Sequence, residues 1–269
     1  MLPALTRIIV TTCLLAISAE TTPTIVVPHF HDLTIKNRIK GGRSGEFTVE
    51  TDIWYFKGSR VRQERLIESD QPDQAPENIW VNITQCDHNA YYFLDGEKKT
   101  YQFWSVPKRI TEFRDALKGE PGGGEIVITF DSVDTGQRRQ VGSYVARRIK
   151  TTTSIDPSAN SGARRGKMES DGWYVDLPGW DLCLQSSQQG WWGIETEPDH
   201  HPRILERWRG VKRGFPIELT TKITEVGCPD SFGCHPGAQS PPIEFAEISE
   251  QPLDQALFEV PKDYTRIDH

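Results

Sequence analysis

Apolar and polar residues alternate along most of the chain, and this pattern predicts β-strands. From Leu33 to Lys40 the odd positions are mainly apolar, and Phe47 to Tyr55 repeat the pattern beyond a glycine-rich turn. Alternation with period two is typical of a strand with one buried face, so these two segments predict a hairpin. Further strands are expected at 61–67, 79–83, 126–130, 141–153, 168–175, 215–226 and 243–248.

A second hairpin has the clearest turn signal in the sequence. Asp95-Gly96 lies between two aromatic segments, 91–94 and 100–104, and this dipeptide tolerates the positive φ angles of tight turns. Helical spacing is rare by comparison. It predicts a short helix at 107–118, one turn at 204–208, and one turn at 253–257 capped by Asp254, before a terminal strand at 258–260.

The first residues have the form of a secretory signal peptide. Arg7 precedes an apolar stretch that ends in small residues, which predicts a signal at 1–19. The stretch is too short to span a bilayer, which needs about 20 apolar residues, and no later segment approaches that length. A lipid anchor at Cys13 is the alternative, but Thr12 stands where a lipobox requires a smaller residue. We expect export to the periplasm or the extracellular space, without a transmembrane segment after cleavage.

Export changes how the cysteines are interpreted. After cleavage four remain, and disulfides are the default for an exported chain. Three pairings are possible, and the favoured one joins Cys228 to Cys234 and Cys86 to Cys183. The latter bond would pin a long insertion at about 178–202, which is rich in tryptophan, glycine and glutamine.

Acidic residues outnumber basic ones by 38 to 31, so nucleic acid is not an expected partner.

The residues that could do chemistry do not form a convincing site. Histidines at 29, 31, 200, 201 and 235 lack metal-ligand spacing, and a zinc site at Cys228, Cys234 and His235 would need a fourth ligand. No nucleophile elbow is present. Glu64, or Glu50 with Asp52, could supply a carboxylate pair, but alternation places Glu50 and Asp52 on a polar face, where solvation is the simpler explanation. We therefore expect a non-enzymatic protein without cofactor or metal.

The aromatic residues say most about a possible ligand site. Several lie on or beside predicted strands, some with a parity opposite to that of the main apolar set. One interpretation is a core on both faces of the sheet, with helices covering one face. The other is a curved sheet whose concave side lines a cavity for an apolar ligand. The residues expected to line it are Trp54, Phe56, Trp80, Tyr92, Trp104 and Trp173.

Three stretches resemble a known family. These are Gly142-Ser143-Tyr144, the segment GFPIELTTK at 214–222, and the segment from Glu247 to Tyr264 that contains LFEVP. Together with the early strand at 54–62, they resemble a family of exported bacterial proteins of unknown function that is itself similar to the LolA-like lipoprotein carriers. The resemblance covers about 32–267.

The resemblance implies a fold and a class of ligand. LolA-like proteins form an unclosed antiparallel half barrel with a lid of short helices, which implies a single mainly β domain at 20–269. It also implies a periplasmic binding protein for an apolar or lipid-like ligand, such as a lipoprotein acyl chain. The insertion at 178–202 and the Cys228 to Cys234 loop depart from those carriers. The alternative is an envelope structural module with a filled barrel, whose Trp191 and Trp192 contact an envelope protein or a glycan.

Overall fold

The computed structural model describes residues 29–41, 48–68, 77–105, 117–177, 180, 201–225 and 242–267. Within them the protein is mainly β, and thirteen strands form one sheet. The strands are β1 Phe30–Gly41, β2 Thr48–Gly58, β3 Arg60–Glu68, β4 Glu77–Gln85, β5 Ala90–Asp95, β6 Thr100–Ser105, β7 Glu125–Val141, β8 Tyr144–Pro157, β9 Gly166–Val175, β10 Arg203–Gly210, β11 Phe215–Glu225, β12 Ile243–Ser249 and β13 Thr265–Arg266.

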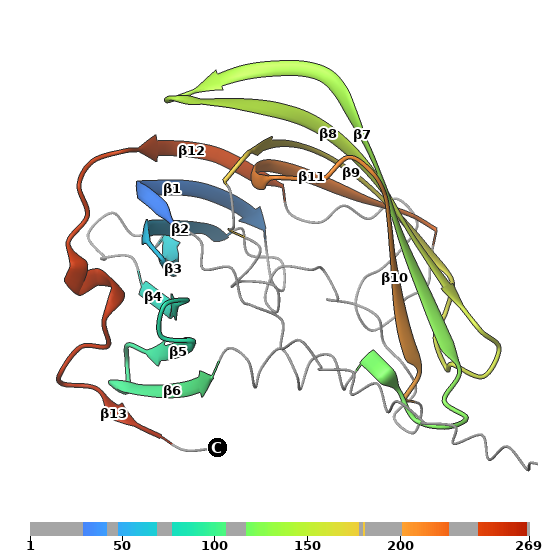
Figure 1. The fold of residues 1–269 in the computed structure, drawn as a ribbon, viewed down its shortest axis with the longest axis horizontal. Coiled ribbons are helices and arrows are strands. Elements are labelled where there is room, and N and C mark those ends of the chain that lie inside the picture. The colour runs from blue at the N-terminus through green and yellow to red at the C-terminus, as the bar shows by residue number, and fades with distance from the viewer. Residues whose placement is uncertain are drawn as a thin grey trace, which may run out of the picture.

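The sheet is curved, mostly antiparallel and unclosed. Its strand order is β10-β7-β8-β9-β11-β12-β1-β2-β3-β4-β5-β6-β13, and only the outermost pairs, β10 with β7 and β13 with β6, are parallel. In Figure 1 the strands arch from β6 and β13 on one side over β1 and β12 to β10 on the other. The two end strands do not pair with each other, so the expected unclosed antiparallel architecture is confirmed.

Both predicted hairpins are present. β1 pairs with β2 so that Leu33 lies opposite Phe56 and Ile35 opposite Trp54. β5 pairs with β6 around the turn after Asp95, whose carboxylate accepts a hydrogen bond from the Lys98 amide at 3.0 Å. Local alternation and turn residues were therefore sufficient to define these two units.

Three local predictions were wrong. The segment at 204–208 is part of strand β10 rather than a helical turn, because residues four apart share a face in a strand as well as in a helix. The terminal strand is β13, not 258–260. The strand that begins at 126 continues through polar residues to Val141. The turn near 253–257 is confirmed as the 3-10 helix η2 (Gln255–Phe258), and Asp254 caps it by accepting from the Ala256 amide.

Several predicted features lie outside the described residues. They are the signal segment with Cys13, most of the helix at 107–118, most of the insertion at 178–202, and the loop between Cys228 and Cys234. Of the predicted helix, only Leu117 and Lys118 are described, and both are helical. No described helix is long and apolar enough to cross a membrane.

The longest hairpin, β7 with β8, bends over the sheet (Figure 1). Asp134 pairs with Ile149 but Arg138 pairs with Arg147, so β7 has three residues where β8 has one. This bulge tightens the local twist. The hairpin tip reaches β12, where the Ser143 amide donates to the Glu250 carboxylate at 3.3 Å. At the same tip, Gly142 has a φ of 59° and lies against Ile248.

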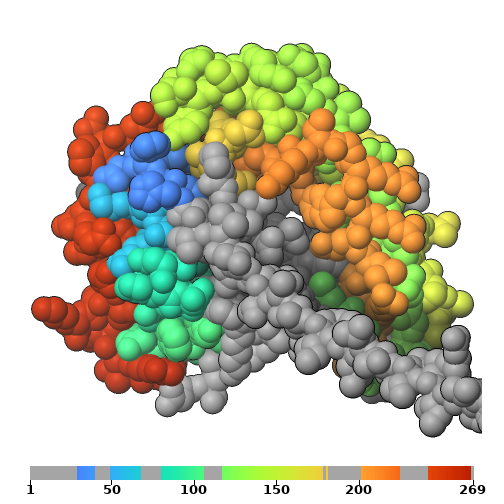
Figure 2. Space-filling view, in the orientation of Figure 1, coloured from blue at the N-terminus to red at the C-terminus, as the bar shows by residue number. Residues whose placement is uncertain are grey.

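Two apolar clusters lie on opposite faces of the sheet around β1 to β6. The main core joins Leu33, Ile35, Trp54 and Phe56 to residues of β9 and β11. A smaller cluster of β4 and β5 packs against the C-terminal segment through Val260 and Tyr264. In Figures 1 and 2 this C-terminal segment, shown in red, runs down the outer side of β3 to β6. The face that carries Trp54 and Phe56 is therefore the inner face of the arch.

Candidate functional site

Two of the six predicted ligand residues belong to the packed core. Trp54 is 4% exposed and Phe56 is fully buried. Phe215 contacts both in edge-on geometry, with ring centroids 5.4 Å and 5.5 Å away, and Trp180 lies 5.4 Å from Phe215. The rings of Trp54 and Phe56 are thus covered by protein side chains, and this part of the arch is filled.

Trp80 and Trp104 share the inner face with Trp54 but are only partly buried. The guanidinium of Arg65 lies 4.9 Å from the centre of the Trp80 ring. Trp104 pairs across the hairpin with Tyr91, at 5.7 Å between ring centroids. Aromatic residues on the inner face therefore extend from β2 to β6.

Tyr92 lies on the opposite face from Trp104. It is the cross-strand neighbour of Phe103, and its ring centroid lies 6.0 Å from that of Tyr101 in a tilted arrangement, beside the C-terminal segment. On β5 the inward aromatic residues are Tyr91 and Phe93, which are not among the six predicted cavity residues. The turn at 96–99 pairs Asp95 with Thr100, so counting back from the turn would have given Tyr91 as the partner of Trp104.

The two carboxylates that were expected on a solvated face lie instead on the inner face, and this prediction was wrong. Asp52 is 7% exposed and accepts two hydrogen bonds from Arg65, at 2.6 Å and 2.9 Å. Glu50 lies 3.6 Å from the same guanidinium. The reason is parity, because Glu50 and Asp52 share their face with Trp54 and Phe56. Glu64 lies on the other face of the sheet and pairs with Arg62. The pKa of Tyr55 is raised to about 12, mainly by burial and further by the nearby Glu64 carboxylate.

Trp173 lies in a groove beside the junction of β11 and β12. Within the described residues these two strands share the pair Leu219 with Ile243. The groove along this junction encloses about 680 Å³. Five apolar and five polar or charged side chains line it: Trp173, Leu219, Pro242, Ile243 and Phe245, with Arg148, Asp171, Glu218, Thr220 and Glu244.

Two ion pairs flank the Trp173 ring. Arg148 donates to both oxygens of Asp171 at 2.8 Å, and this hydrogen bonding holds the pKa of Asp171 below its usual value. Arg139 lies 4.7 Å from the ring centre and 3.0 Å from Glu218. The charges therefore compensate each other around an aromatic surface. Such a site suits a ligand with an apolar part and hydroxyl or other neutral polar groups.

A second pocket, of about 650 Å³, lies beside the C-terminal segment, and Asp32, Lys57 and Arg60 are among its lining residues. Its charges are paired. Lys57 lies 2.7 Å from Asp32, whose carboxylate also accepts from the Leu253 amide. Arg60 pairs with Asp87 at 3.2 Å. These bonds hold the C-terminal segment in place, so we assign this pocket a structural role.

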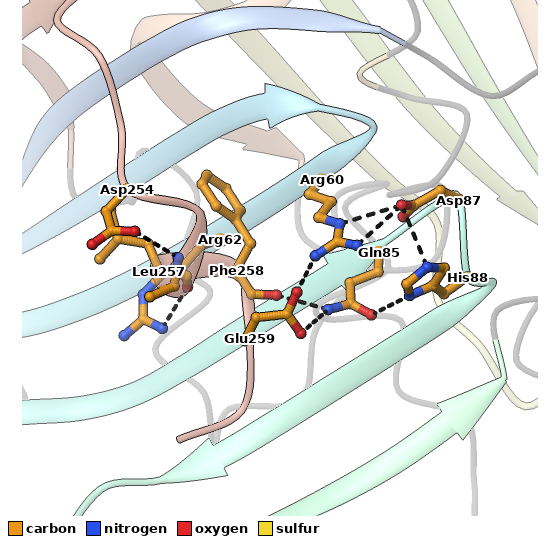
Figure 3. A network of polar contacts seen from close by, with 10 residues as sticks. Arg60, Arg62, Gln85, Asp87, His88, Asp254, Leu257, Phe258 and Glu259 are labelled. Atoms are coloured by element: carbon orange, nitrogen blue, oxygen red, sulfur yellow. Dashed lines mark hydrogen bonds and ion pairs between the residues drawn. The ribbon is translucent and has the colours of Figure 1, made fainter. Parts of the chain in front are cut away.

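The network beside that pocket extends this role (Figure 3). Arg60 also pairs with Glu259, and the buried Gln85 side chain donates to the Phe258 carbonyl at 2.7 Å and to Glu259 at 3.1 Å. His88 completes the network through the Gln85 side-chain oxygen. The contacts of Arg60 with Glu259 and of Gln85 with Phe258 and Glu259 join the start of β3 and the end of β4 to the C-terminal segment.

The remaining predicted residues are placed as follows. His29 and His31 line the second pocket, His201 is exposed, and no cluster of three metal-ligating side chains occurs in the part of the chain that the structure describes. His200, His235, Cys183, Cys228 and Cys234 lie outside the described residues. Cys86 is disulfide-bonded, and its pairing with Cys183 stays a prediction.

No protein-family model matches the chain, and no curated protein matches it.

Proposed function

We propose that the protein is an exported, non-catalytic binding protein that holds an amphipathic, lipid-like ligand in the groove between β9, β11 and β12. The observation that carries this proposal is the groove itself. It combines a tryptophan surface with four other apolar side chains, and its volume falls within the range of about 300–1,000 Å³ that is typical of ligand pockets.

The unclosed sheet supports the proposal together with the resemblance to LolA-like carriers. A half barrel offers an apolar ligand an entrance that a closed barrel does not. Because the core around Trp54 and Phe56 is filled, we place the ligand beside Trp173 rather than behind Trp54. The signal-like first residues agree with a place in the periplasm or outside the cell.

A second candidate function is glycan binding, because Trp173 is flanked by paired charges. An aromatic ring can stack on the apolar face of a sugar, while Asp171, Glu218 and Arg148 have the hydrogen-bonding groups that hydroxyls require. This candidate corresponds to the interaction module that the sequence left open. It differs from the first in needing the carboxylates themselves.

Native mass spectrometry of the protein purified from its host, followed by solvent extraction, tests the leading proposal. We expect a bound amphiphile, and we expect Trp173→Ala to weaken rebinding by roughly 30-fold, as for a central tryptophan in an interface. Phe103→Ala, which removes a half-buried ring far from the groove, is the matched control and should rebind normally.

The two candidates predict different responses to Glu218→Gln. An apolar ligand should tolerate this change, whereas a glycan should be lost. Protein that carries no amphiphile and binds none after delipidation would refute the leading proposal. Loss of glycan-array binding in Glu218→Gln would then identify the second.

A further inference from the structure

Strand β10 forms one end of the sheet, and within the described residues no strand pairs with its outer edge. The Arg203 amide donates to the Gly124 carbonyl at 2.9 Å, and the Val211 amide donates to the Ser132 carbonyl at 3.0 Å. Both bonds point toward β7, so the odd-numbered residues of β10 are those whose backbone groups pair with β7. The amides and carbonyls of Ile204, Glu206 and Trp208 point the other way, where no described strand lies.

The two faces of this edge strand differ in charge. Arg203, Arg207 and Arg209 share one face by alternation, and all three are exposed. Glu125 and Asp131 are the register neighbours of Arg203 and Arg209 on β7, yet no ion pair within the described residues involves these three arginines. The surface along this face therefore has positive charge available, in a chain with a net charge of −7.

The opposite face of β10 carries Ile204, Glu206 and Trp208, and the Arg213 guanidinium lies 5.2 Å from the centre of the Trp208 ring. Ile204 packs against the cluster of Ile126 and Ile128, and Trp208 stacks on Phe130 with 4.1 Å between ring centroids. Trp208 nevertheless remains 47% exposed. A strand added beside β10 would cover the exposed part of this ring.

We propose that the open edge of β10 is a docking site for an extended segment of another protein in which acidic and apolar residues alternate. Such a segment would bond through its backbone to Ile204, Glu206 and Trp208, in the manner of β-augmentation. Its acidic side chains would lie beside the arginine face and its apolar side chains beside Ile204 and Trp208. A second copy of the same strand fits poorly, because antiparallel pairing of β10 with itself sets arginine against arginine.

Charged residues on an edge strand also have a simpler explanation, since they prevent unwanted strand addition. The two explanations differ in what they predict for an acidic partner. If the arginines only prevent strand addition, the edge does not bind an acidic strand. A docking site binds the acidic strand through backbone and side chains together.

The test uses the full chain and a capped octapeptide that alternates valine and glutamate, with binding measured by calorimetry. A peptide that alternates valine and lysine, and a valine–glutamate peptide with a central proline, are the controls. We expect binding of the first peptide alone. Arg207→Gln with Arg209→Gln should weaken it by roughly two- to fivefold for each arginine, as for opposite-charge pairs across strands. Lys222→Gln with Lys262→Gln, a matched loss of charge at exposed positions elsewhere, should have no effect.

Hydrogen exchange supplies the decisive measurement. On binding, we expect slower exchange of the Ile204, Glu206 and Trp208 amides, while the Leu205 and Arg207 amides, already bonded to β7, change little. Failure of the acidic peptide to bind would overturn the proposal. It would also be overturned if the proline peptide bound equally well or if the three outward amides stayed unprotected, because binding would then be electrostatic alone.

Discussion

Phe215 joins the two halves of the sheet, and its replacement should be unusually costly. Within the described residues, β11 and β12 share the register pair Leu219 with Ile243. The Phe215 ring is 1% exposed and contacts Trp54, Phe56 and Trp180 at 5.4–5.5 Å between ring centroids. Side-chain packing of Phe215 therefore joins β11 to β2 across the inner face of the sheet.

Truncation of a buried phenylalanine to alanine costs about 3–5 kcal/mol, through lost transfer energy and the cavity left behind. The aromatic contacts add to the burial term, so we expect Phe215→Ala to fall in the upper half of that range. Total stabilities of about 5–15 kcal/mol are usual, and the change would remove a large part of the free energy of unfolding. Val133→Ala, at a 60% exposed position of β7, is the control and should cost less than about 0.5 kcal/mol.

Urea unfolding followed by both tryptophan fluorescence and far-ultraviolet circular dichroism measures the effect. In the wild type we expect coincident transitions, and in Phe215→Ala we expect them to separate, because the two halves lose their common core. A loss below about 1 kcal/mol with transitions that still coincide would show that other contacts join the halves and that Phe215 is not the residue that couples them.

Two further predictions concern polar groups that the fold buries. Burial raises the pKa of Glu206 above its usual value despite a hydrogen bond from Trp208 and the nearby Arg213, and one of its carboxylate oxygens is buried without a hydrogen-bond partner. The Glu206 carboxyl therefore keeps its proton to higher pH in the folded state than in the unfolded state. Its contribution to the free energy of unfolding falls as pH rises from about 4 through the folded pKa. Glu206→Gln should then be more stable than the wild type near pH 7 but not near pH 4 in paired thermal melts, and a pH-independent difference would contradict this. Gln85→Ala leaves the Phe258 carbonyl without its donor and should cost about 1–3 kcal/mol, with faster proteolysis of the C-terminal segment; unchanged proteolysis would mean that the network in Figure 3 does not hold that segment.

The candidate site was only partly accessible from sequence. Trp173 was chosen because it is an aromatic residue on a predicted strand, and the structure places it in the groove. Its neighbours in the groove, Phe245 and Pro242, come from a segment about 70 positions later, and no local pattern connects them. Tyr92 was chosen in place of Tyr91 because both are aromatic, and only the cross-strand pairing with Trp104 separates them.

Local sequence patterns were enough to define most of the strands and two of the hairpins, because alternation and turn chemistry are properties of a few neighbouring residues. It could not decide that 204–208 is a strand, since a spacing of four fits both periods and only pairing with β7 selects one. Nor could it decide which face of β2 is the core, because both faces carry apolar residues. These points depend on the folded sheet, as does the strand order, which sets β1 beside β12, with Lys36 opposite Glu247. Such neighbours are selected by the burial of whole faces, and that free energy depends on the complete sheet rather than on any one segment.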